Sequence, residues 1–398
     1  MARFGAGGCA DADVIKAAER AAADALAPLG GRRPDLVCFF VCSADADDFA
    51  LAATRIADVT QGRAVLGCSA PGVLGGATVL ESTAAVSVWV AVLPGVAVRT
   101  FHLEVMAVDE GLAVIGLPER RGDDQVALLL AEPQSFPADN FVERLNAQMP
   151  GLAVVGGVAG TQLAGSKPML FHDGRCVERG AVGAFLGGPV TARVVVAQGC
   201  RAVGQAMVVT ATERNVLLAL AGQPAAAKLE EIVSMLPPDE QALASRELLL
   251  GVVMDEYADE HESGDFVVRR IIGSDEATGG VLLAAAIAVG TSVRLHVRDA
   301  EAAGVELTTA LGWLADSTDL DQIDGVLLFS GQARSGLFAR EDHEIAAVRS
   351  ALGGPAIAGL LTGGEVGPAG GRNWLHSGSL AILAFGSGRF VPRGARPD

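Results

Sequence analysis

The sequence predicts an α/β protein of two related domains, built from duplicated units with mixed, largely buried β-sheets flanked by helices. Two observations support this class: short apolar runs alternate with helix-like segments, and the same order of elements recurs along the chain. With 398 residues, the chain is long enough for two or three domains that each bury a core. Hydrophobic residues make up 50% and charged residues 19%, which excludes a disordered chain.

The clearest unit spans residues 325–385. It opens with GVLLFSG, an apolar run that predicts a buried strand ending at a sharp turn. Ile345, Val348 and Leu352 then share one helical face, and Gly353, Gly354 and Pro355 end the helix. A second buried strand, a glycine-rich loop containing Glu365 and a third strand at 379–385 follow. The unit is therefore strand, helix, strand, polar loop, strand.

The same order occurs twice earlier, from residue 35 and from residue 125. The spacing from the first strand to the glycine of the second is nearly constant, in the pairs Val37 with Gly67, Val126 with Gly156, and Val326 with Gly359. A weaker fourth copy is expected in residues 247–289. These long copies predict duplicated half-domains rather than a solenoid, and their closing strands predict mixed sheets.

The expected organisation has four parts. Residues 1–34 form a lead-in with a helix over 11–29, capped by Asp11 or Asp13. The N-terminal domain covers 35–236, the C-terminal domain 237–390, and a tail 391–398. Pro237 and Pro238 mark the boundary, because two prolines cannot continue a helix. The acidic loop at 255–265 lacks the ligand spacing of an EF-hand, so we expect it to be solvated and predict no metal.

Charge and cysteine usage limit the partners and the compartment. The net charge of −17 argues against nucleic acid or an anionic membrane as partner. No apolar run is long enough for membrane insertion, and the N-terminus lacks the apolar core of a signal peptide. The 6 cysteines form no C-x-x-C pair, and Cys38 and Cys42 lie in a predicted buried strand. We expect reduced thiols and a cytoplasmic protein.

Several stretches, taken in order, carry a family resemblance: LGCSAPGVLGG, VVGGVAG, QGCRAVGQAMVVT, DFVVRRIIG, HVRDA, LLFSGQARSGLF and GLLTGGEVGP. Over residues 35–385 the chain resembles FIST (F-box and intracellular signal transduction) proteins, with both the N-terminal and the C-terminal FIST domain. The family commonly has Phe-Ser-Cys and then Gly-Arg-Gly where this chain has Phe329, Ser330, Gly331 and then Ala333, Arg334, Ser335. The cysteine is lost and the arginine is kept, which argues against a thiol-based role there.

The resemblance implies a stand-alone bacterial sensory protein that binds a small ligand, such as an amino acid, without catalysis. Its partners would be that ligand and a histidine kinase or another signalling protein. Some FIST members bind haem and sense nitric oxide, so a haem cofactor held by His296 or His376 is an alternative. No cofactor is expected in the main interpretation.

The residues predicted to bind the ligand follow buried strands or lie on the C-terminal loops. Strand-end turns with bare amides suit carboxylate or phosphate groups. An arginine opposite a glutamate could clamp the two charges of an amino acid, although Arg334 and Glu365 could instead pair with each other. The full set is Gly67, Cys68, Ser69, Gly156, Gly157, Ser330, Arg334, Gly364, Glu365, Arg372 and Asn373.

Two further expectations concern charge and catalysis. Buried charges are normally matched, so Arg269 is expected to pair with Asp299. A hydrolase using Ser69 or Cys68 is the second alternative to the sensor. However, Pro71 interrupts a G-x-S-x-G elbow, GTQLAGSKP departs from a phosphate loop, and no H-E-x-x-H occurs. The main interpretation therefore has no catalytic residue.

Overall fold

The computed structural model describes residues 1–43, 45–81, 84–109, 111–163, 165–255, 263–316 and 322–387. The chain divides into two compact units, Met1–Val196 with Thr308–Asp398 (unit 1) and Ala197–Leu307 (unit 2). Most of the acidic loop at 255–265, and the tail at 391–398, lie outside the described residues. No helix among the described residues is long and apolar enough to cross a membrane.

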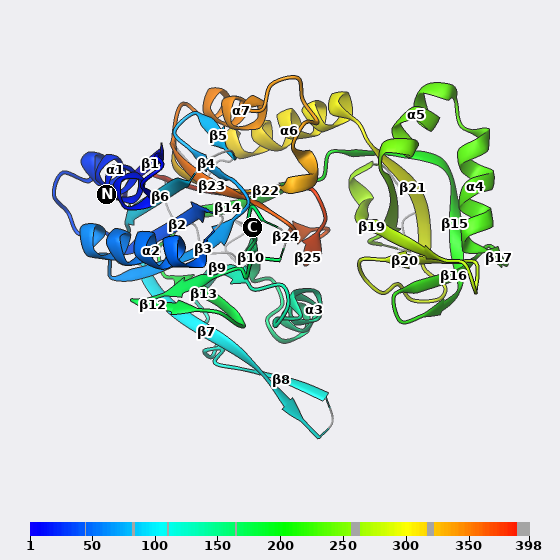
Figure 1. Cartoon of the computed structure of the whole chain (residues 1–398), viewed down its shortest axis with the longest axis horizontal. Helices are drawn as coiled ribbons and strands as arrows, with labels where there is room; N and C mark the ends of the chain where they lie inside the picture. The colour runs from blue at the N-terminus through cyan, green and yellow to red at the C-terminus, as the bar shows by residue number, and fades with distance from the viewer. Residues whose placement is uncertain are drawn as a thin grey trace, which may run out of the picture. The chain divides into compact units, whose positions relative to one another are not determined.

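Unit 1 contains three copies of one supersecondary unit (Figure 1). In each copy, the first strand pairs in parallel with the second and antiparallel with the closing strand. The predicted α/β class and mixed sheets are therefore confirmed. The copies are β2 (Leu36–Cys42), α2 (Ala46–Thr60), β3 (Ala64–Ala70) and β6 (Ala85–Val92); β9 (Asp124–Ala131), α3 (Ala138–Gln148), β10 (Ala153–Val158) and β13 (Ala181–Gly187); and β22 (Gln322–Gly331), α7 (His343–Ala351), β23 (Ala356–Thr362) and β26 (Leu380–Ser387).

Each copy also carries a short hairpin that leaves its own sheet. The hairpins are β4 (Val73–Gly75) with β5 (Thr78–Leu80), β11 (Leu170–His172) with β12 (Arg175–Val177), and β24 (Glu365–Ala369) with β25 (Arg372–His376). The first joins β23 of the third copy, the second joins β3 of the first copy, and the third joins β10 of the second copy. The three copies are thus linked in a closed ring of exchanged hairpins.

Three sheets result, and they share one apolar core. Strands β1 (Arg3–Ala10), β7 (Ala97–Val108), β8 (Gly111–Ile115) and β14 (Ala192–Ala197) extend them at the edges. Every residue of β2 is buried, as is typical of a strand covered on both faces. The ring of Phe40, in the first copy, packs edge to face against that of Phe329, in the third copy, with 6.2 Å between the ring centroids. The ring centroids of Trp89 and Phe385 are 5.2 Å apart. These contacts fasten the copies to one another through aromatic packing.

The N-terminal helix forms as the sequence predicts. Helix α1 (Val14–Leu26) is capped by Asp13, whose side chain accepts hydrogen bonds from the amides of Ile15 and Lys16. It passes into a 3₁₀ turn, η1 (Ala27–Leu29), and Gly30 then takes a left-handed conformation. The preceding strand β1 was not predicted. Two of its glycines lie against this helix: a Cβ on Gly5 would be 1.9 Å from the Ala25 carbonyl oxygen, and a Cβ on Gly7 would be 2.1 Å from the Ala21 carbonyl oxygen.

Unit 2 is a closed antiparallel barrel, and its described residues include the helices α4 (Ala225–Met235) and α5 (Pro238–Arg246) and the first half of α6 (Ala300–Ala315). Its strands, in order round the barrel, are β15 (Cys200–Glu213), β21 (Ser292–Arg298), β18 (Leu248–Val253), β19 (Phe266–Asp275), β20 (Gly280–Leu283) and β16 (Val216–Leu220), which returns to β15 and also carries β17 (Gln223–Pro224).

The barrel corrects the expectation of a fourth copy in residues 247–289. Strands β18 and β19 are antiparallel neighbours, whereas a copy would need a parallel pair. Burial along β15 is mixed, because a barrel has one solvated face, while the copies in unit 1 have strands buried on both faces. Pro237 and Pro238 lie at the start of α5, inside unit 2, where proline suits the first turn of a helix.

Candidate functional site

We describe three cavities of unit 1, and the first lies at the carboxyl ends of β22 and β23. We call it the β22–β23 cavity; its volume is about 130 Å³. Leu74, Val79, Glu81 and Leu361 line one part of it, and Ser330, Arg334 and the segment from Ser335 to Glu344 line the other. Because β4 and β5 are the hairpin that the first copy contributes to this sheet, two copies build the cavity together.

A buried ion pair forms the base of this cavity. Arg334, in the 3₁₀ turn η3 (Gln332–Arg334), donates from Nε to Oε1 of Glu344 at 2.6 Å. Ser330, at the end of β22, donates to Oε2 of the same carboxylate at 2.9 Å. The Arg334 side chain is 1% exposed and that of Glu344 11%. Each charge is thus matched within the protein, as a buried charge must be.

This pairing corrects the alternative in which Arg334 pairs with Glu365. Glu365 is fully buried in β24 and accepts a hydrogen bond from the Ser379 amide at 2.6 Å. Sequence reasoning missed Glu344 as the partner of Arg334. The available signal was its position in the first turn of the helix that follows β22, where a carboxylate is favoured by the helix dipole.

Charges of both signs stand around the mouth of the β22–β23 cavity. Arg340 is exposed and pairs with Asp342, its Nη2 lying 2.8 Å from Oδ2. Glu81 accepts a hydrogen bond from the Ser335 hydroxyl at 3.1 Å, and Glu341 is an exposed lining residue. Phe338 supplies an apolar wall and stacks on the His343 ring at 4.1 Å.

A second, much smaller cavity of about 10 Å³ lies at the equivalent ends of β2 and β3. Its volume is roughly what one water molecule needs. Ser69 lines it, and the Ser69 hydroxyl accepts a hydrogen bond from the Met169 amide at 2.8 Å. Burial raises the pKa of the neighbouring Cys68 thiol, which keeps it protonated. Neither side chain has the environment of an activated nucleophile.

The predicted glycines lie within strands rather than after them. Gly67 is in the middle of β3, and Gly156 and Gly157 are in β10. One glycine has the same position in each copy, opposite a residue of the exchanged hairpin. The pairs are Gly67 with Phe171, Gly156 with Val366, and Gly359 with Leu74. A Cβ at these glycines would stand 2.5 Å from the Phe39 ring, 1.8 Å from the Leu129 carbonyl oxygen and 2.2 Å from the Leu328 carbonyl oxygen, respectively.

These glycines therefore permit the strands to approach closely, and none of them lines the three cavities. Gly157 and Gly364 both pack near Thr362, whose hydroxyl donates to the Val158 carbonyl at 2.7 Å and accepts from the Gly364 amide at 3.2 Å. Ligand binding by the predicted glycines stays a prediction, and their positions in the structure do not support it.

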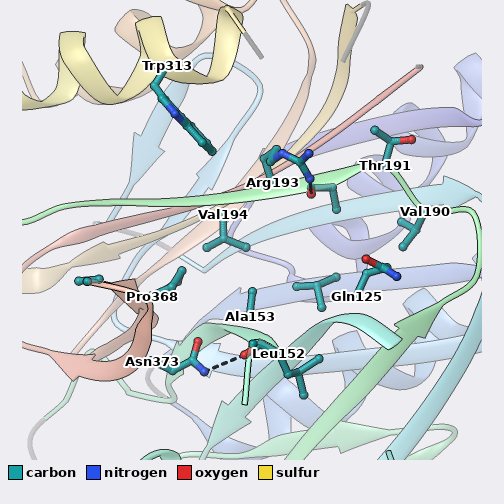
Figure 2. Close-up of a pocket in the computed structure, with 16 residues that line it drawn as sticks. Gln125, Leu152, Ala153, Val190, Thr191, Arg193, Val194, Trp313, Pro368 and Asn373 are labelled. Atoms are coloured by element: carbon teal, nitrogen blue, oxygen red, sulfur yellow. Dashed lines mark hydrogen bonds between the residues drawn. The ribbon is translucent and has the colours of Figure 1, made fainter. Parts of the chain in front are cut away.

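A third cavity, of about 310 Å³, contains the predicted residue Asn373 (Figure 2). The Asn373 amide is engaged by the protein itself: Nδ2 donates to the Leu152 carbonyl at 2.8 Å and Oδ1 accepts from the Val154 amide at 2.8 Å. Arg372 lies outside the lining and places its guanidinium 5.1 Å from the centre of the Trp374 ring.

The two histidines considered for haem are both buried. His296, in the barrel, shares a hydrogen bond with the Arg294 carbonyl at 3.0 Å, and desolvation lowers its pKa to about 4. His376 shares one with the Gly367 carbonyl at 3.1 Å. Neither ring lines any of the three cavities. An axial ligand needs an open face for the haem, and these packed surroundings do not fit one.

The charge pair expected in the barrel has a different partner. Asp299 accepts a hydrogen bond from Arg201 Nε at 2.7 Å, and this bond lowers the pKa of its carboxyl group. Arg201 also contacts Glu240 at 2.6 Å. Arg269 is buried, as expected, whereas Asp299 belongs to a partly exposed network around Arg201.

Comparison with known proteins adds the family. The FIST N domain model matches residues 35–223 and the FIST C domain model matches residues 225–368. The chain is 34% identical over 383 residues to the uncharacterized protein Rv0628c of Mycobacterium tuberculosis (strain ATCC 25618 / H37Rv), covering 96% of this chain and 99% of that protein. It is also 34% identical over 384 residues to the uncharacterized protein Mb0898c of Mycobacterium bovis, covering 96% and 98%.

Proposed function

The chain belongs to the FIST family, and from that premise we propose that it is a sensory protein of signal transduction that binds a small zwitterion in the β22–β23 cavity. FIST domains suggest a sensory role, which the resemblance of the sequence already implied. The observation that carries the proposal is the buried Arg334–Glu344 pair beneath a mouth lined by charges of both signs.

The location of the cavity favours ligand binding. In α/β sheets, ligands bind beyond the carboxyl ends of the parallel strands, and β22 and β23 are such a parallel pair. The volume of about 130 Å³ is below the roughly 300–1,000 Å³ of pockets for drug-sized ligands. A metabolite of the size of an amino acid therefore suits it better than a nucleotide does.

The charges favour a ligand that carries both signs. The Arg340 guanidinium would receive the carboxylate, because its planar fork matches two carboxylate oxygens. Glu81 and Glu341 would receive the ammonium group. Since Arg334 and Glu344 neutralise each other, they hold the base of the cavity in one conformation and leave the choice of ligand to the residues at the mouth.

The proposed role is binding without catalysis, in the cytoplasm, with the liganded state read by a histidine kinase or another signalling protein. The burial of Cys68 and the engagement of the Ser69 hydroxyl support the non-catalytic part. The net charge of −17 makes an anionic nucleic acid an unsuitable partner.

A thermal-shift screen of the purified chain against the common amino acids tests this function. A ligand at 100 times its dissociation constant should stabilise the protein by about 2.7 kcal/mol. Arg340→Gln and Glu81→Gln should each abolish the shift, because each removes one charge from the mouth. Arg349→Gln is the matched control, since Arg349 is exposed in the last turn of α7 and lines none of the three cavities.

The absence of any shift, or a shift that survives both variants, would contradict the proposed site. Two readings on the same sample separate the alternatives. A Soret band would support the haem sensor, and turnover of a chromogenic ester would support a hydrolase.

A further inference from the structure

A two-stranded ribbon extends one sheet of unit 1 beyond the layers that cover it. Strands β7 and β8 form this ribbon, which Figure 1 shows reaching away from the rest of unit 1. Residues 97–103 of β7 pair with β13, whereas residues 104–108 pair with β8 alone among the described strands. Strand β8 is the last strand of its sheet, so its outer edge is open in the described part of the chain. We call residues 104–115 the β7–β8 arm.

The β7–β8 arm carries large apolar side chains that face solvent. Met106, Val108, Leu112 and Ile115 are between 43% and 59% exposed. Paired residues share a face of the ribbon, so Met106, Val108 and Ile115 lie on one face and Leu112 lies on the other. A ribbon of two strands is marginally stable in water, and grouped apolar side chains of this kind mark an interaction surface.

The open edge of the arm has none of the usual protection against pairing. Soluble proteins commonly place charges or proline on an edge strand, and β8 reads GLAVI, with neither. Between Glu104 and Glu119 the charged residues are Asp109 and Glu110, which lie between the two strands in the sequence. The edge therefore presents backbone donors and acceptors within an uncharged strip.

This strip is complementary to itself. When two β8 strands pair antiparallel about Ala113, Ala113 of one copy faces Ala113 of the other, and Gly111 faces Ile115. The smallest residue of the strand is thus opposite one of its largest, and the two apolar faces continue across the join. Glu104 lies beside Ile115 in its own ribbon, so the two Glu104 carboxylates stand at opposite corners of the new sheet rather than opposite each other. No like charges face each other in this register.

We propose that the β7–β8 arm is a dimer interface, in which β8 of two copies of this chain pair antiparallel about a two-fold axis. The two ribbons then form one four-stranded sheet, and each open edge is satisfied by the other. The arm shares no residue with the β22–β23 cavity, so the dimer is independent of the proposed amino-acid site.

Sedimentation velocity of the purified full chain, from about 1 to 200 µM, tests the proposal. One strand pair is a small interface, so the species of twice the chain mass should form at the high end and dissociate on dilution. Salt of roughly 0.15 M keeps the net charge of −17 on each copy screened. Hydrogen exchange of the backbone amides in residues 111–115 should slow as the dimer forms.

A charge exchange at the two-fold axis makes the test specific to this register. Ala113→Glu and Ala113→Lys should each leave the chain monomeric over the same range, because like charges would face each other. An equal mixture of the two variants should form a dimer, because a glutamate then faces a lysine. Leu51→Glu is the matched control and should dimerise like the unaltered chain, since Leu51 is also exposed but lies on α2.

A purified chain that stays monomeric at every concentration would overturn the proposal and leave the arm to a different protein. A dimer formed by Ala113→Glu alone, or a mixture of the charged variants that fails to dimerise, would overturn the pairing about Ala113. Circular dichroism checks that each variant folds, and Leu112→Glu, at an exposed position, gives a second disruption of the same contact. The amino-acid thermal shift should be unchanged in Ala113→Glu, so the dimer and the proposed function are judged separately.

Discussion

Gly67 and Phe39 are paired neighbours on β3 and β2, and the Phe39 ring occupies the space where a Cβ of residue 67 would lie, 2.5 Å away. In the other two copies, a different group occupies the space next to the equivalent glycine. There, Gly156 and Gly359 lie against backbone carbonyl oxygens of the first strand. A glycine repeated at this position is thus explained by strand packing in all three copies.

The packing explanation predicts that a second substitution can restore stability after Gly67→Ala but not after Gly359→Ala. Gly67→Ala should lower the free energy of unfolding by about 1–3 kcal/mol through overpacking, and Phe39→Leu in the same chain should recover part of it. Gly359→Ala should lack such a rescue, because its clash at 2.2 Å is with the Leu328 carbonyl oxygen. Gly122→Ala is the control, since no atom lies within 4 Å of its Cβ position. Urea unfolding of these four variants and of Phe39→Leu alone measures this; additive effects at 67 and 39 would contradict it.

The buried Arg334–Glu344 pair predicts strong asymmetry between single and double substitutions. Glu344→Ala should cost about 3–5 kcal/mol, because it leaves the Arg334 guanidinium buried without its carboxylate. Replacing both residues together, Arg334→Met with Glu344→Leu, should cost far less. The exposed pair gives the control: Asp342→Asn should leave the free energy of unfolding nearly unchanged, because water screens an exposed ion pair. Denaturant unfolding measures all three, and a double variant as unstable as the single one would contradict the argument.

Much of unit 1 follows from sequence patterns. The repeated spacing to Gly67, Gly156 and Gly359 predicted the duplicated copies, since fully buried strands are short, continuous apolar runs. The exchanged hairpins could not be predicted, because β4 has three residues and pairs with β23 far along the chain. The unit 2 barrel was missed because its strands resemble those of the copies in composition, although their burial is mixed.

The candidate site was predicted in part. Ser330 and Arg334 do line a cavity at the end of β22, and Asn373 lines another. Glu365 was chosen as the charge opposite Arg334, whereas Glu344 has that role. Glu344 lies in the first turn of α7 and Glu365 at the start of β24, and sequence spacing contains no information on which of the two faces the guanidinium.

The buried imidazole of His296 predicts a loss of stability in acid. The main cause is desolvation, which lowers the folded-state pKa of His296 to about 4 from an ordinary value of 6.5. The unfolded chain therefore binds the proton more readily, so stability is complete above about pH 6.5 and is lost as pH falls toward 4. The full effect is about 3 kcal/mol. Urea unfolding of the native chain and of His296→Leu at pH 7 and pH 5 measures it; an equal loss in both proteins would contradict the assignment.

Thiol reactivity should follow burial, and this also tests the hydrolase alternative. Burial raises the pKa of Cys38 to about 12 and raises that of Cys68 further, so both remain protonated at pH 8. Cys176 is exposed and should react with Ellman's reagent in the native protein, a phase that Cys176→Ser removes. Cys38 and Cys68 should react only after unfolding in guanidinium, as peptide mass spectrometry of the modified chain can verify. Modification of Cys68 in the native state would show that its thiol is accessible and would support the hydrolase alternative.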